Sequence, residues 1–166
     1  MKTPSISLID VFKDTLNELY NAEKQYSKYF MVLSRSALTK ELMSALAPSQ
    51  TEIEIHMERL KQIMRLQNIK LTKATSVIDD ELIKNAKLSI PPKQSLIKDI
   101  QILHWAKIMG QAKIVRYELL FLMAVQLELE LPSALLEQCF KDNKNTDSYL
   151  TQIAQNIIFP MSAAKD

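Results

Sequence analysis

Apolar side chains recur at alternating intervals of three and four residues in four long segments of this chain. That spacing places them on one face of an α-helix and is typical of helices that pack into a bundle. The chain of 166 residues contains a single glycine, which argues against a fold with many tight turns or a glycine-rich phosphate-binding loop. The pattern therefore predicts an all-α fold, a bundle of four long helices.

Capping residues and prolines set the expected helix boundaries. The long helices should start near Ser7, cover 40–67 with a kink or restart at Pro48, cover 93–130, and run from Ser133 to about Phe159, before Pro160. A short helix is expected over 76–88, within the otherwise undetermined connection 69–95. So long a connection predicts that the second and third long helices run parallel, as in bundles with one crossover. Residues 1–166 are expected to form one domain.

Charge and composition exclude several classes of protein. The net charge is only +2 and the charges are interspersed, so no basic face for nucleic acid is expected. No apolar run is long enough to span a membrane, and the N-terminus lacks the apolar region of a signal peptide. The single Cys139 rules out an internal disulfide framework. A cytoplasmic protein is expected.

Polar or small residues interrupt the apolar seams near the middle of each long helix. They are Glu23, His56, Gly110 and Asn143, with Glu52 one turn before His56. A glutamate within an apolar seam is costly unless it is paired or bound to metal. We expect Glu23 to pair with His56 across the bundle, with metal binding as the alternative. Gly110 is interpreted as a point of close packing, where a neighbouring side chain fills the volume.

Several short motifs resemble a known family. The string ELYNAEKQ at 18–25 strongly resembles the first-helix signature of the YciE/YciF-like family of ferritin-like bacterial proteins. HMERL at 56–60, KNTD at 144–147 and Asp99 add support, and the resemblance covers about residues 7 to 155. It implies a ferritin-like bundle, usually a dimer, linked to bacterial stress responses. Family members can carry a di-metal carboxylate site of iron or manganese inside the bundle.

The ligands of that site carry over only in part. The resemblance implies Glu23, Glu52, His56 and Asp142 as metal ligands. The family's third-helix glutamate falls on Gly110, which has no ligating group, and one of its fourth-helix acids falls on Asn143, whose neutral amide is a poor ligand. The site is therefore predicted to be degenerate.

Three functional hypotheses follow. The first is a non-catalytic stress-associated homodimer without a cofactor. The second is an active di-iron or di-manganese protein that handles oxygen or peroxide through Glu23, Glu52, His56 and Asp142, with Asp147 as a further ligand. The third is a mononuclear zinc or iron site at Glu23, Glu52 and His56. No small-molecule substrate is identifiable. The homodimer is also predicted from Leu119–Val125, a segment that is apolar on every side of its helix.

Overall fold

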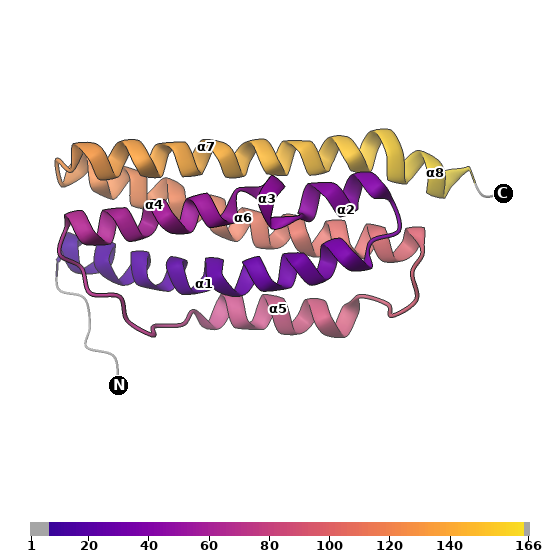
Figure 1. The fold of residues 1–166 in the computed structure, drawn as a ribbon, viewed down its shortest axis with the longest axis horizontal. Coiled ribbons are helices and arrows are strands. Elements are labelled where there is room, and N and C mark those ends of the chain that lie inside the picture. The colour runs from indigo at the N-terminus through magenta and orange to yellow at the C-terminus, as the bar shows by residue number, and fades with distance from the viewer. Residues whose placement is uncertain (1–6, 165–166) are drawn as a thin grey trace.

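The computed structural model describes residues 7–164, and every regular element among them is helical (Figure 1). The all-α fold predicted from the seams is confirmed. In chain order the elements are α1 (Leu8–Ser36), α2 (Lys40–Leu46), α3 (Pro48–Thr51), α4 (Ile53–Leu66), α5 (Val77–Ser89), α6 (Leu96–Gln126), α7 (Glu130–Ile153), the π-helix η1 (Ala154–Ile158) and α8 (Phe159–Ala163).

The bundle consists of α1, the broken helix α2–α4, α6 and α7, arranged side by side along one long axis (Figure 1). The colours of Figure 1 show that α2–α4 and α6 run in the same direction, while α1 and α7 run the opposite way. The chain therefore returns along the bundle between α4 and α6, and this crossover carries α5. The predicted parallel pair and the extra helix are both confirmed, and the arrangement is consistent with a ferritin-like bundle.

The second bundle helix is broken into three pieces, not merely kinked as predicted. Ala47, the residue before Pro48, is extended because a following proline disfavours helical backbone. Glu52 then adopts a left-handed conformation with φ of 56° and precedes α4. At this break Ser49, seven residues before the buried His56, lies on the exterior, and Thr51 is buried.

The fourth bundle helix begins earlier and ends later than predicted. Its first residue is Glu130, and Pro132 sits in its first turn, where a backbone N–H has no helical acceptor to lose. The prediction that Pro160 ends the helix is wrong. A π-helical turn precedes this proline, in which the N–H of Phe159 bonds to the carbonyl of Ala154, and α8 continues to Ala163. The wider turn accommodates the missing donor of the proline.

Side-chain caps explain where two of the long helices begin. Oγ of Ser7 accepts a hydrogen bond from the backbone N–H of Asp10 at 3.3 Å, as predicted. Oγ of Ser95 accepts one from the N–H of Lys98 at 3.0 Å, so α6 starts at Leu96, slightly later than expected. Each cap satisfies one of the free donors of the first helical turn.

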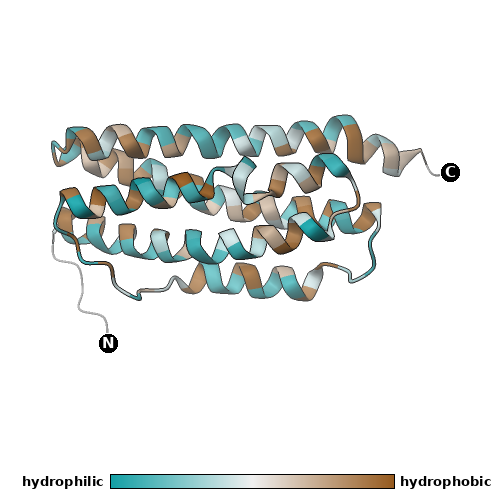
Figure 2. Ribbon diagram, in the orientation of Figure 1, coloured by the Kyte–Doolittle hydropathy of each residue, from teal (hydrophilic) through white to brown (hydrophobic). Residues whose placement is uncertain are grey.

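The core is divided into two apolar clusters, one toward each end of the bundle. One contains Phe12, Leu16, Leu60, Tyr117 and Cys139, and the other contains Phe30, Leu33, Ile53, Met109 and Leu150, among others. On every bundle helix a buried polar residue lies in sequence at or near the boundary of the two clusters: Glu23, His56, Lys113 and Asn143. Figure 2 shows polar and apolar positions alternating along α1 and α7, as the sequence pattern requires.

Within residues 7–164, no helix combines the length and the apolar character needed to cross a membrane.

Candidate functional site: a buried ionic centre

Glu23 of α1 and Lys113 of α6 form the middle of the buried polar layer. The Nζ of Lys113 lies 3.1 Å from Oε1 of Glu23, and the two side chains are 4% and 0% exposed. The contact is an ion pair without hydrogen-bond alignment, because Oε1 has no aligned donor among the described residues. The ammonium also lies 5.8 Å from the ring centroid of Tyr26 and 5.5 Å from that of Phe30. These electron-rich ring faces are favourable surroundings for a cation.

Two further side chains contact the other oxygen of Glu23. Tyr117 donates a hydrogen bond to Oε2 at 3.1 Å, and Nδ1 of His56 lies 3.8 Å from the same atom. Burial raises the pKa of Glu23, but Lys113 and His56 together outweigh burial and hold this pKa below its ordinary value. Burial, followed by the charge of Glu23, raises the pKa of the Tyr117 hydroxyl. Glu23 is therefore a carboxylate and Tyr117 a neutral donor.

His56 links Glu23 to the fourth bundle helix. Its Nε2 lies 3.3 Å from Oδ2 of Asp142, and its Nδ1 lies 3.4 Å from the amide nitrogen of Asn143. That amide also donates to the backbone carbonyl of Cys139 at 2.8 Å. Nδ1 of His56 therefore faces both Glu23 and Asn143, whereas Nε2 faces Asp142. The predicted proximity of Glu23 and His56 is found, with Asn143 in the same network.

Asp142 has a cation of its own. Arg59 donates from Nη1 to Oδ2 of Asp142 at 2.7 Å, and Gln138 donates to Oδ1 at the same distance. Burial raises the pKa of Asp142, but the bonds from Arg59, Gln138 and His56 together hold it below its ordinary value. The centre thus contains two carboxylates, Glu23 and Asp142, each beside a basic side chain.

Glu52 lies at the edge of the centre. It is half-buried, and the left-handed turn before α4 directs it toward the same region as His56 and Asp142. One ligand atom from each of Glu52, His56 and Asp142 can be chosen so that all lie within 4.8 Å of one another. Asp147, the further ligand of the oxygen-handling hypothesis, is instead held by Lys107, whose Nζ lies 2.9 Å from Oδ1.

Gly110 faces empty space, so the predicted close packing at this position is wrong. Apart from the adjoining residues and nearby backbone of α6 itself, no atom lies within 4 Å of the place where a Cβ would stand. A small cavity of about 20 Å³ lies there, and its polar lining comes from Thr51, Lys113, Asn143, Thr146 and Asp147. This volume has room for one water molecule.

A second buried network attaches the crossover helix to the bundle. Asp79 of α5 is 1% exposed and accepts two hydrogen bonds from Arg116, each of 2.6 Å. Tyr26 donates to the same carboxylate. Burial, followed by the hydrogen bond to Asp79, raises the pKa of Tyr26. The network joins α5 to α1 and α6 through a paired charge, which is the form in which buried carboxylates are tolerated.

The sequence pattern located only part of this centre. The structure brings together Glu23, His56, Asp142 and Asn143 as expected, with Glu52 alongside. Lys113, Tyr117 and Arg59 were not recognised as members. A signal for Lys113 was present, because it follows Gly110 by three positions and three is as good a seam interval as four. Ile114, four positions after Gly110, is also buried, so both seam intervals lead to a buried side chain.

The fold and the centre define the class as an all-α bundle protein with ionisable residues across its middle layer. The chain belongs to the family described as a domain of unknown function (DUF892), whose model matches residues 7–160. It is 28% identical over 149 residues to protein YciF of Escherichia coli (strain K12), which covers 89% of this chain and 90% of that protein. The resemblance seen in the first-helix motif is confirmed.

Two solved structures share the fold. The crystal structure of the E. coli stress protein YciF superposes with a TM-score of 0.86 at 27% identity, covering 92% of this chain and 97% of that one. YcfI from Rhodopseudomonas palustris, for which a structural role has been suggested, superposes with a TM-score of 0.84 at 22% identity, covering 91% and 97%. The second likeness, at this low identity, concerns the fold alone.

Proposed function

We propose that this chain is a non-catalytic, homodimeric, cytoplasmic protein of the bacterial stress-response type, in which a buried ion-pair centre replaces a di-metal site. The observation that carries the proposal is the ion pair between Lys113 and Glu23. The stress context comes from the similarity to the E. coli stress protein YciF.

Glu23 and Asp142 each have a basic partner without a metal. Lys113 compensates Glu23 and Arg59 compensates Asp142, at 3.1 Å and 2.7 Å. A di-iron or di-manganese centre draws carboxylates from all the helices around it to neutralise two divalent ions. Here Gly110 supplies no donor, Asn143 supplies only a neutral amide, and Lys113 would bring an ammonium next to the incoming ions. The residues present do not fit a di-metal centre, and we derive no reaction through one.

The proposed dimer rests on the outer face of α6. Val115, Leu119, Leu122 and Val125 are each between 51% and 53% exposed and lie three or four positions apart. Residues at this spacing form one continuous apolar strip along a helix. The prediction that Leu119–Val125 is apolar on every side is consistent with this strip, and a second copy of the chain would cover it.

Metal content after aerobic loading tests the proposal. Wild-type protein, loaded separately with iron, manganese and zinc and then desalted, is expected to retain less than one metal per ten chains by mass spectrometry. The matched variant is Gly110→Glu/Lys113→Ala/Asn143→Glu, which restores two carboxylates and removes the ammonium, and is expected to retain more metal than wild type. Two metals per wild-type chain, lost in Glu23→Ala, would overturn the proposal and support the oxygen- or peroxide-handling alternative.

A second candidate, a mononuclear site, is favoured by one observation. The ligand atoms of Glu52, His56 and Asp142 lie within 4.8 Å of one another. A carboxylate–imidazole–carboxylate set suits zinc or ferrous iron. It differs from the set inferred from the sequence, because Asp142 stands in place of Glu23. One metal per chain, lost in His56→Ala and retained in Glu23→Gln, would establish this site.

A further inference from the structure

A groove lies away from the ionic centre, between α1, α5 and the connection from α5 to α6. Its volume is about 560 Å³, within the range of small-molecule sites in proteins. Apolar side chains form most of its surface, among them Tyr29, Val32, Leu33, Ile83, Ile90 and Pro91. The crossover contributes to it, because α5 lies beside α1 and the connection from α5 to α6 adds Ile90, Pro91 and Pro92 to the lining (Figure 1).

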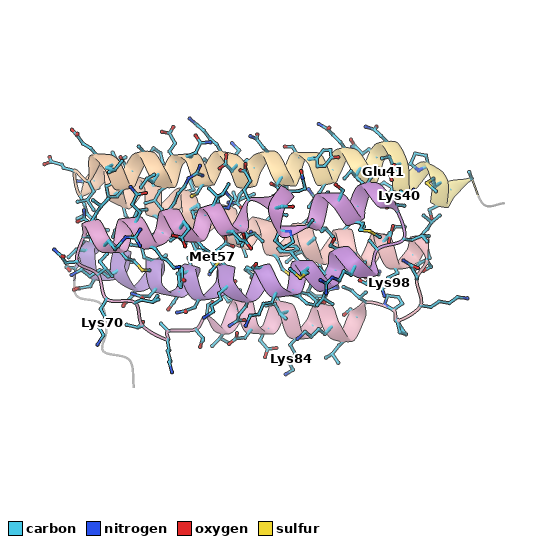
Figure 3. All side chains as sticks on the ribbon, viewed as in Figure 1. Lys40, Glu41, Met57, Lys70, Lys84 and Lys98 are labelled. Atoms are coloured by element: carbon cyan, nitrogen blue, oxygen red, sulfur yellow. The ribbon has the colours of Figure 1, made fainter. Side chains whose placement is uncertain are left out.

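The cation Lys98 lines this groove and lacks a carboxylate partner. Lys98 is 9% exposed, and its Nζ donates to the backbone carbonyl of Pro92 at 3.1 Å. No carboxylate of residues 7–164 lies within ion-pair distance of this ammonium. The neighbouring Asp99 is already used, since it accepts from the backbone N–H groups of Leu38 and Thr39 at 2.7 and 2.9 Å. Figure 3 shows Lys98 at the end of the bundle, near the turn into α6.

The charge around the groove is uniformly positive. Lys28 and Lys87 line it together with Lys98, and no acidic residue does. The Nζ of Lys87 lies 5.6 Å from the ring centroid of Tyr29, so this side chain lies over the apolar floor. A buried ammonium with a single carbonyl acceptor is costly, and an anion that enters beside it lowers that cost. An apolar surface next to it favours a ligand that also carries a hydrocarbon portion.

We infer that this groove binds an amphipathic organic anion, an acyl-chain carboxylate, whose carboxylate pairs with Lys98 and whose chain lies along Val32, Leu33 and Ile90. A small hydrated anion gains nothing from the apolar walls, and a neutral chain leaves the ammonium without a counter-ion. Both halves of the ligand are therefore required. This site is independent of the ionic centre and of the function proposed for it.

Calorimetric titration with dodecanoate, below its aggregation concentration, tests the inference directly. Dodecanoate is expected to bind with one site per chain, at least about tenfold more tightly than either dodecanol or acetate, since each lacks one half of the recognised chemistry. Equal affinity for dodecanoate and dodecanol would overturn the role of Lys98. Absence of dodecanoate binding at millimolar concentration would overturn the site.

Variants locate the binding. Lys98→Met keeps the apolar stem and removes the charge. It should therefore weaken the binding of dodecanoate about tenfold or more and leave the affinity for dodecanol unchanged. Lys70→Met is the control, because Lys70 is exposed and lies at the opposite end of the bundle (Figure 3). The midpoint temperature of thermal unfolding of Lys98→Met should be no lower than that of wild type, because the variant removes a buried charge that has no carboxylate partner. Unchanged dodecanoate affinity in a folded Lys98→Met contradicts the inference.

A third variant distinguishes a groove that binds a ligand from a groove that is covered by a second copy of the chain. Val32 is 57% exposed, so Val32→Trp should fold and fill the groove. Loss of dodecanoate binding with an unchanged mass by light scattering supports the inference. A dimeric wild type that does not bind dodecanoate, and that dissociates in Val32→Trp, would show that the groove is an interface between copies and would overturn it.

Discussion

The ammonium of Lys113 lies 3.1 Å from Oε1 of Glu23, and both side chains are shielded from solvent by the four bundle helices. A buried ion pair of this kind contributes little net stability as a pair, but each partner is costly when left alone. Glu23→Gln should therefore lower the free energy of unfolding by about 3–5 kcal/mol, because it strands the ammonium. Glu23→Gln/Lys113→Met should recover most of that loss, since Gln still accepts from Tyr117. Urea denaturation of Glu23→Gln, Lys113→Met and Glu23→Gln/Lys113→Met measures this coupling between the two side chains. Additive losses would contradict it.

Acid should weaken the centre in a defined pH range. The pKa of Glu23 in the folded protein lies below its ordinary value of 4.5. A depressed pKa means that the unfolded chain binds more protons, so this stabilisation is present above about pH 4.5 and is lost as the pH falls toward the folded pKa. Asp142, whose folded pKa is also depressed, acts in the same direction from its ordinary value of 3.8 downward. Free energies of unfolding between about pH 6 and about pH 3 should fall less steeply in Glu23→Gln/Lys113→Met than in wild type. Parallel curves would contradict the assignment.

The space beside Gly110 should accept a methyl group. Since no neighbouring helix places an atom within 4 Å of the Cβ position and the residue is in the middle of α6, Gly110→Ala should raise the free energy of unfolding by about 1 kcal/mol. The adjacent exposed Gln111→Ala is the matched control, with an expected change of only a few tenths of a kcal/mol. Chemical denaturation of the three proteins decides the matter, and a less stable Gly110→Ala would mean that the gap is needed.

Cys139 should be inert in the folded protein. The side chain is fully buried, and burial raises the pKa of its thiol to about 12. The thiolate, which is the reactive form, is therefore scarce and also inaccessible at neutral pH. A disulfide reagent followed by absorbance should show one thiol per chain reacting rapidly in denaturing urea, and about 100-fold more slowly in buffer. Rapid reaction in buffer would indicate that α7 opens frequently.

The apolar strip on α6 should control the oligomeric state. Leu119→Glu/Leu122→Glu introduces two charges into the proposed dimer interface, where they would be buried without partners. We expect wild type to have the mass of a dimer by light scattering at micromolar concentration, and this variant to have the mass of a folded monomer. Gln62→Glu, at an exposed position of α4, should leave the dimer intact. A monomeric wild type would contradict the proposed assembly.

The spacing of apolar residues determined the helical elements and their approximate ends, because that spacing is a local property of the chain. It also indicated the crossover, since so long a connection between the second and third helices allows them to run parallel. The N-cap at Ser7 was readable for the same reason: a cap involves only residues close in sequence. The assignment of residues 1–166 to one domain stays a prediction.

What only the tertiary structure decided concerns groups that meet across helices. Glu23 and Lys113 are 90 positions apart, and the choice between Lys113 and Ile114 as the inward residue depends on the rotation of α6 against its neighbours. The cavity at Gly110 depends on whether facing side chains can reach it, which the seams do not specify. The break at Glu52 and the placing of Lys98 away from any carboxylate of residues 7–164 likewise follow from how packed elements place their ends. Local periodicity defines each helix face, whereas the partner of a buried charge is chosen by the packing of the whole bundle.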